Sequence, residues 1–105
     1  MNIDEQKMVD DVMDWFDWEK VHKVMVFLDW KWGLNGQVPS IQDLRSKARL
    51  YMYEAIGQRK PHFIIASGGL KVTAWRDERG DKLTGLHLEF VLTDWYVDDG
   101  RDNEG

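Results

Sequence analysis

Apolar residues recur at three- and four-residue steps through the first half of the chain, a spacing that predicts α-helices. A short helical pattern covers residues 4–14, so we expect segment 1–15 to be a loosely ordered helix. A second helix is predicted from Trp18 to about Trp32, with Asp17 as its N-cap and a glycine-containing end. Its predicted buried stripe consists of Trp18, Val21, Val24, Met25, Leu28 and Trp32.

A third helix is predicted to begin after Pro39, because a proline disfavours helix in the residue before it and Ser40 can cap the first turn. Asp43, at the third helical position, completes a pattern like a capping box. The helix is expected to reach about Ile56 and to end at Gly57. Its predicted buried stripe consists of Ile41, Leu44, Ala48, Tyr51, Ala55 and either Met52 or Tyr53.

In the last third of the chain the pattern changes to the alternation that is typical of β-strands. A short strand is predicted at residues 63–66 and is followed by a tight turn or bulge at 67–69. Two alternating strands are predicted at 70–76 and 86–95. The expected fold is therefore α+β, with two to three N-terminal helices packed on one face of a C-terminal three-stranded antiparallel β-sheet.

The alternation also predicts how the last two strands pair. A midpoint at Gly80 places apolar residues opposite each other on one face and polar or aromatic residues on the other, whereas a slip of one residue mixes the faces. The pattern favours this register, an odd-length loop near Gly80, and helices that cover the apolar face. The second face is either covered by the N-terminal segment or exposed. The predicted pairs are Leu70 with Phe90, Val72 with Leu88, Ala74 with Leu86, Lys71 with Glu89, Thr73 with His87 and Trp75 with Gly85.

The composition is that of one folded domain. The chain has 105 residues, of which 43% are hydrophobic and 31% charged, and it has no cysteine. Disulfides and thiolate metal sites are therefore excluded. The N-terminus is acidic and no apolar run is long enough to span a bilayer, so we expect a cytoplasmic protein without membrane contact.

The net charge of −5 is unevenly distributed. Residues 1–19 carry a net charge of −6 and residues 94–105 a net charge of −4, while residues 20–93 carry +5. We expect both ends to be solvated, with 96–105 as an acidic flexible tail. The alternatives are that an acidic segment folds over a basic face or presents a negative surface to a basic partner, as a mimic of nucleic acid would.

The following segments occur in this order along the chain: Phe16 to Met25, Trp30 to Trp32, Val38 to Ser40, Ala66 to Gly69 and Phe90 to Trp95. Their pattern and order resemble a group of small uncharacterised proteins of about 100 residues encoded by tailed bacteriophages. The likeness covers roughly residues 16–95 and departs at Ser67 and Leu70, where the group commonly has threonine and phenylalanine. It implies a phage or prophage origin and a role in the cytoplasm of a bacterial host, and it implies no catalytic residues.

No motif for catalysis, a metal or a cofactor stands out, since the three histidines lie on separate predicted elements without ligand spacing. Six tryptophans are more than a domain of this size usually buries, and tryptophan is frequent in binding hot spots. The preferred hypothesis is a non-enzymatic phage accessory protein that binds a host macromolecule, expected to be a host protein, and thereby inhibits a defence or regulatory protein. The candidate interaction face consists of Trp75, His87, Trp95, Lys71 and Glu89.

The first alternative is a protein that sequesters a small anionic nucleotide with the basic middle segment and a stacking tyrosine. An enzyme whose site assembles from scattered residues is a further alternative, and the sequence is compatible with a homo-oligomer. Binding to extended nucleic acid is disfavoured because the sequence pI is about 5.1. The candidate ligand residues are Arg45, Arg49, Tyr51, Arg59 and Lys60.

Overall fold

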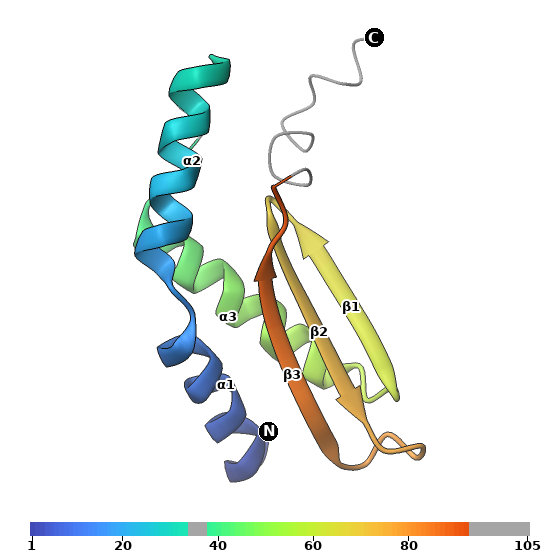
Figure 1. Ribbon diagram of the computed structural model, residues 1–105. Coiled ribbons are helices and arrows are strands. Elements are labelled where there is room, and N and C mark those ends of the chain that lie inside the picture. Colours follow the sequence, from blue (N-terminus) through green and yellow to red (C-terminus); the bar gives the residue numbers. More distant parts are fainter. Residues whose placement is uncertain (34–37, 93–105) are drawn as a thin grey trace, which may run out of the picture.

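The computed structural model describes residues 1–33 and 38–92. Three helices are followed by a three-stranded antiparallel sheet, which confirms the predicted α+β fold (Figure 1). None of the helices in these two ranges combines the length and hydrophobicity needed to cross a membrane. The elements are α1 (Ile3–Trp15), α2 (Trp18–Trp32), α3 (Ile41–Gly57), β1 (His62–Ser67), β2 (Leu70–Arg76) and β3 (Leu83–Phe90).

Local capping fixes where the helices begin. The side chain of Asp17 accepts a hydrogen bond from the third amide of α2, and Ser40 does the same for α3, as the sequence predicts. Gly33 ends α2 in the left-handed conformation, with φ of 62°. The first helix begins at an unpredicted cap, because Asn2 and Glu5 form a reciprocal capping box.

The sheet has the strand order β1-β2-β3, and all six predicted pairs between β2 and β3 are confirmed. A tight turn at Gly68 and Gly69, both with positive φ, joins β1 to β2. The pattern predicted that β3 runs over residues 86–95, whereas it begins at Leu83 and ends at Phe90. Trp95 and the expected tail at 96–105 lie outside the described residues.

The expectation of an odd-length loop at the end of this hairpin is wrong. The register shifts after Trp75, so that Arg76 pairs with Leu83 and the connecting loop spans the six residues 77–82. The shift brings the buried Leu83 into the core and leaves Thr84 exposed. An unshifted register would have placed the polar Thr84 opposite Arg76, so burial of an apolar side chain accounts for the irregularity.

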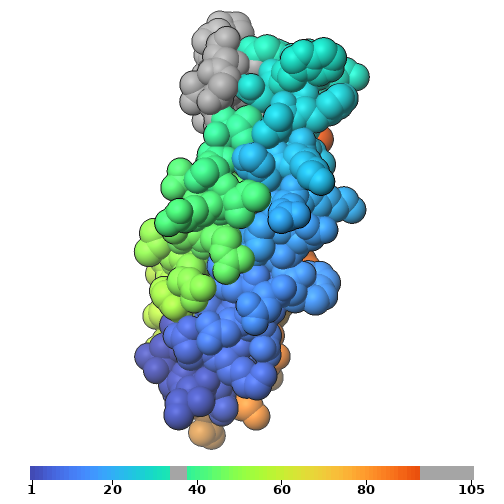
Figure 2. All heavy atoms as spheres, turned by 90° about the vertical axis from the view of Figure 1, so that its left-hand side faces the viewer, coloured from blue at the N-terminus to red at the C-terminus, as the bar shows by residue number. Residues whose placement is uncertain are grey.

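All three helices lie on one side of the sheet (Figure 1), with α3 against β2 and α1 against both β3 and α3. On one outer face of the molecule α1 lies at the bottom, α2 continues upward along one side, and α3 lies beside α2 on the other side (Figure 2). The end of α2 extends past the strands, which explains why the predicted core residue Trp32 is exposed. In α3, Met52 is buried and its alternative Tyr53 is only partly buried, and Tyr51, predicted in the buried stripe, is also only partly buried. The largest fully buried side chains are Met13, Met25, Leu44, Met52, Leu70, Leu88, Val9 and Val72.

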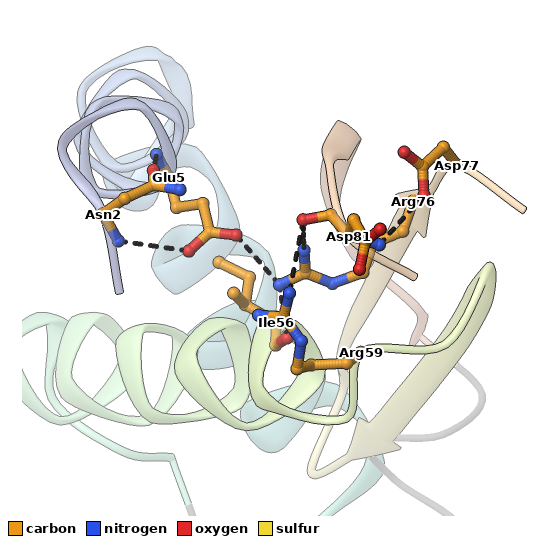
Figure 3. A network of polar contacts seen from close by, with 7 residues as sticks. All are labelled: Asn2, Glu5, Ile56, Arg59, Arg76, Asp77 and Asp81. Carbon is orange, nitrogen blue, oxygen red and sulfur yellow. Dashed lines mark hydrogen bonds and ion pairs between the residues drawn. The ribbon is translucent and has the colours of Figure 1, made fainter. Parts of the chain in front are cut away.

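A buried ion pair joins the helices to the sheet (Figure 3). The Glu5 Oε2 atom lies 3.0 Å from Nη2 of Arg76, and the two side chains are 6% and 1% exposed. Arg76 also donates to the carbonyl of Ile56 at 2.7 Å, at the end of α3, and to that of Asp81 at 3.1 Å, in the β2–β3 loop. One guanidinium therefore connects α1, α3, β2 and this loop.

The pKa of Glu5 reports the balance of forces in this pair. Burial of the carboxyl group raises its pKa, but the backbone amide of Asn2 and the guanidinium of Arg76 together lower it further. The net pKa is below the ordinary value. The pair therefore contributes stability above the pKa that Glu5 has in the unfolded chain, and this contribution is lost as the pH falls through the folded-state pKa.

The β2–β3 loop closes against the end of α3. Gly80 is buried with φ of 75°, and a Cβ atom at this position would collide with the backbone carbonyl of Arg59. Asp77 supports the turn, because its backbone carbonyl accepts from the Gly80 amide and its side chain accepts from the Asp81 amide. Only glycine satisfies both the conformation and the close approach.

Replacing Glu5 by glutamine should lower the free energy of unfolding by roughly 3 kcal/mol at pH 7, because a buried arginine then has no counterion. Urea denaturation measures this. The matched control is Lys7→Gln, which removes an exposed pair with Asp11 on the same helix and should cost less than about 1 kcal/mol. The difference in free energy of unfolding between the wild type and Glu5→Gln should become smaller as the pH falls below about 4.3. Equal effects of the two substitutions at pH 7 would contradict this role of the pair.

Gly80→Ala should lower the melting temperature and cost roughly 1–3 kcal/mol, because alanine is strained at positive φ and its Cβ meets the Arg59 carbonyl. Gly57→Ala is the control, since a Cβ there has no neighbour within 4 Å and Gly57 has no positive φ. Thermal denaturation of both variants checks the prediction, which fails if Gly80→Ala melts at the wild-type temperature.

Candidate functional site

The sheet face opposite the helices is the strongest candidate site. Within the described residues no helix lies on it (Figure 1). The strand registers place residues from all three strands on this face, because directly paired residues of antiparallel strands point to the same side. We define the open sheet face by His62, Ile64, Lys71, Trp75, His87 and Glu89.

Trp75 is the central aromatic residue of the open sheet face. Its ring stacks on that of His62, with centroids 6.0 Å apart and planes inclined by 29°. On its other side the register pairs Trp75 with Gly85, and a Cβ atom at Gly85 would lie 3.1 Å from Cε3 of Trp75. The indole thus covers the glycine, while 38% of the residue remains exposed.

The next rows of the open sheet face combine an apolar and a charged element. Thr73 is buried in the middle strand between Ile64, which is 44% exposed, and the exposed His87. One row further, Nζ of Lys71 lies 3.9 Å from Oε1 of Glu89, and both side chains are partly exposed. The surface therefore passes from aromatic and aliphatic groups to an ion pair.

Four of the five residues predicted for an interaction face, Trp75, His87, Lys71 and Glu89, come together on the open sheet face. The fifth, Trp95, lies outside the described residues. Sequence reasoning missed His62 and Ile64. Alternation within residues 62–67 places these two on one side of β1, but only pairing with β2 decides which side that is.

The structure also shows which face of the sheet the N-terminal segment covers. Helix α1 packs on β3 and α3, on the same side of the sheet as the core. Its buried residues are Glu5, Val9 and Met13. The acidic N-terminal helix therefore does not cover the face that carries Trp75.

The five residues proposed for nucleotide binding do not form one site. Arg45 and Arg49 line a shallow pocket of about 310 Å³ on α3, together with Tyr53. Arg59 and Lys60 follow the far end of the same helix, roughly 20 Å from Arg45 at 1.5 Å per residue. Arg59 donates to the Asp81 carbonyl, and Lys60 lies over the ring of Phe63. Tyr51 is partly buried against the core.

Both arginines of this pocket already have neighbours. The Arg45 guanidinium lies 5.5 Å from the centroid of the Trp18 ring, and Nη1 of Arg49 lies 3.6 Å from Oδ1 of Asp10. Hydrogen bonds from Arg49 and Gln6 lower the pKa of Tyr53. The pocket is positively charged and partly neutralised, which suits a small anion better than an extended polyanion.

Comparisons with known proteins identify no family. No protein-family model matches the chain, and no match is found among curated proteins or solved structures. The resemblance to bacteriophage proteins stays a prediction. In the two described ranges no three histidine, aspartate or glutamate side chains are placed to hold a metal ion.

Proposed function

We propose that this protein is a non-catalytic binding protein whose open sheet face contacts a partner protein. One observation carries the proposal: a half-exposed tryptophan and an exposed isoleucine share a sheet face that no described helix covers. An antiparallel sheet can leave one face in water, but that face is then usually polar. An aromatic and aliphatic surface bordered by charges has the composition of a protein interface.

The geometry supports tight contact at Trp75. Stacking on His62 and packing over Gly85 restrict the indole, so little side-chain entropy is lost when a partner covers it. Tryptophan buries a large area and is among the residues that most often dominate binding energy. The Lys71–Glu89 pair lies beside this centre and can orient a partner through complementary charge.

The predicted phage origin gives the proposal a biological setting. Under this proposal the protein acts on its host by occupying the surface of a host macromolecule. In this setting the partner is a bacterial protein in the host cytoplasm, and binding inhibits a defence or regulatory protein. The support for this step is the resemblance of residues 16–95 together with the open sheet face.

Substitutions on the open sheet face should weaken capture of a partner. The immobilised protein is exposed to bacterial lysate, and each bound protein is identified, purified and titrated. Trp75→Ala and Ile64→Lys should each raise the Kd about 10- to 100-fold, the effect of losing 1–3 kcal/mol at a hot spot. Leu50→Lys is the control, because Leu50 is an exposed apolar residue on α3, away from the sheet face.

A charge swap separates binding from folding. The double variant Lys71→Glu with Glu89→Lys keeps an ion pair at this position but reverses its direction. It should retain the wild-type melting temperature within a few degrees and bind the partner more weakly. The proposal is wrong if every protein captured by the wild type binds equally well to folded Trp75→Ala and to the swapped variant.

The pocket on α3 supports a second candidate function, the binding of a small phosphate-bearing nucleotide by Arg45 and Arg49. In that case ATP should raise the melting temperature of the wild type, and Arg45→Ala should abolish the shift. Arg59→Ala is the matched control and should retain it, because Arg59 does not line the pocket. If ATP leaves the melting temperature unchanged, this second function fails and the sheet-face proposal is unaffected.

A further inference from the structure

Among residues 1–33 and 38–92, most of the exposed large hydrophobic residues lie on the helices. Ile3, Trp15 and Trp30 are 86%, 77% and 78% exposed, at the start of α1, at its end and near the end of α2. Val26 and Phe27 line a shallow depression of about 520 Å³ on α2 together with Trp30. The exposed apolar residues around this depression form a candidate contact surface, and Ile3 and Trp15 add separate exposed apolar side chains along α1.

Charge is divided between the two helices of this surface. The exposed charged residues of α1 are four aspartates and one lysine, and those of α2 are three lysines and one glutamate. Both helices lie along the same outer face, one above the other (Figure 2). This face therefore has an acidic half, with a net charge of −3 from these residues, and a weakly basic half, with a net charge of +2 that becomes +1 when the partly buried Asp29 of α2 is included. The residues are Asp4, Asp10, Asp11, Asp14 and Lys7 on α1, and Lys20, Lys23, Lys31 and Glu19 on α2.

We propose that this face binds a second copy of the same chain in a two-fold symmetric dimer, with α1 of each copy against α2 of the other. The two helices have similar lengths, 13 and 15 residues. A two-fold axis that crosses the helices near their junction therefore places α1 of one copy opposite α2 of the other, in antiparallel direction. The acidic half of each copy then meets the basic half of its partner. A partner of uniform charge would be repelled by one of the two halves.

The positions of individual residues fit this symmetry. Ile3 and Trp30 both lie 13 or 14 residues from the junction at residues 16–17, roughly 20 Å along the helices. Ile3 is therefore placed toward the apolar depression of the partner, which otherwise faces water. Trp15 lies next to the junction, where it meets its own symmetry mate across the axis.

The expected affinity is modest. Two helices of about 40 Å combined length and roughly 10 Å contact width bury about 400 Å² on each copy, or about 800 Å² in total, which is below the range of stable specific interfaces and corresponds to a weak, transient contact. We therefore expect a reversible dimer with a Kd in the micromolar range that weakens at high salt. The open sheet faces lie on the far side of each copy, so the dimer presents two of them and can bind a bivalent partner with increased avidity.

Sedimentation equilibrium of the full chain between about 1 and 500 μM measures the Kd of the dimer. The wild type is compared with two charge-reversed variants. Variant A carries Lys20→Glu and Lys23→Glu, and variant B carries Asp11→Lys and Asp14→Lys. Each alone should dimerise at least tenfold more weakly than the wild type, because like charges then meet across both halves of the interface. An equimolar mixture of A and B should restore the dimer, since acidic and basic helices again face each other. Circular dichroism confirms that both variants are folded.

Controls separate this inference from the proposed function. Lys60→Glu with Arg79→Glu changes the net charge as variant A does, at exposed positions after the end of α3 and in the β2–β3 loop, and should leave the dimer intact. Trp75→Ala should also leave it intact. The inference is overturned if the wild type is monomeric throughout this range, if variants A and B dimerise like the wild type, or if their mixture shows no restoration.

Discussion

The arrangement of this fold depends on the buried pair of Glu5 and Arg76. Arg76 reaches from the end of β2 to α1, to the last turn of α3 and to the β2–β3 loop, so four parts of the chain meet at one guanidinium. A buried ion pair adds little to the stability of a fold when it is compared with apolar residues of equal size. Loss of one partner nevertheless lowers the stability strongly, because the other partner remains buried and charged. The pair therefore fixes how α1 and α3 are positioned on the sheet, rather than adding greatly to stability.

The same constraint explains the irregular end of the hairpin. Arg76 points toward the helices, and the register shift after Trp75 lets Leu83 enter the core beside it. The loop beyond turns back on Gly80, whose close approach to Arg59 brings the Asp81 carbonyl within reach of both arginines. Trp75, the residue immediately before Arg76, points to the opposite face. The feature that ties the helices to the sheet thus also directs the main aromatic residue outward.

The molecule has two chemically different sides. The open sheet face is small, with one restrained tryptophan beside an ion pair, and this arrangement suits a hot spot for a partner protein. The helical side is longer, and its exposed hydrophobic residues and divided charge suit a symmetric contact between two copies. Because the sheet separates the two surfaces, each can be changed by substitution without altering the other.

The sequence by itself determined the features that arise from local chemistry. The caps at Asp17 and Ser40 and the pairing of β2 with β3 follow from side chains near one another in sequence or in strict alternation. Most of the candidate face followed from that pairing. Only the tertiary structure decided that Glu5 and Arg76 are buried together and that His62 and Ile64 join Trp75. Each of these features depends on contacts between elements that are distant in sequence. The periodicity of one helix or strand predicts which of its faces is buried, but it does not predict which residue of another element will contact that face.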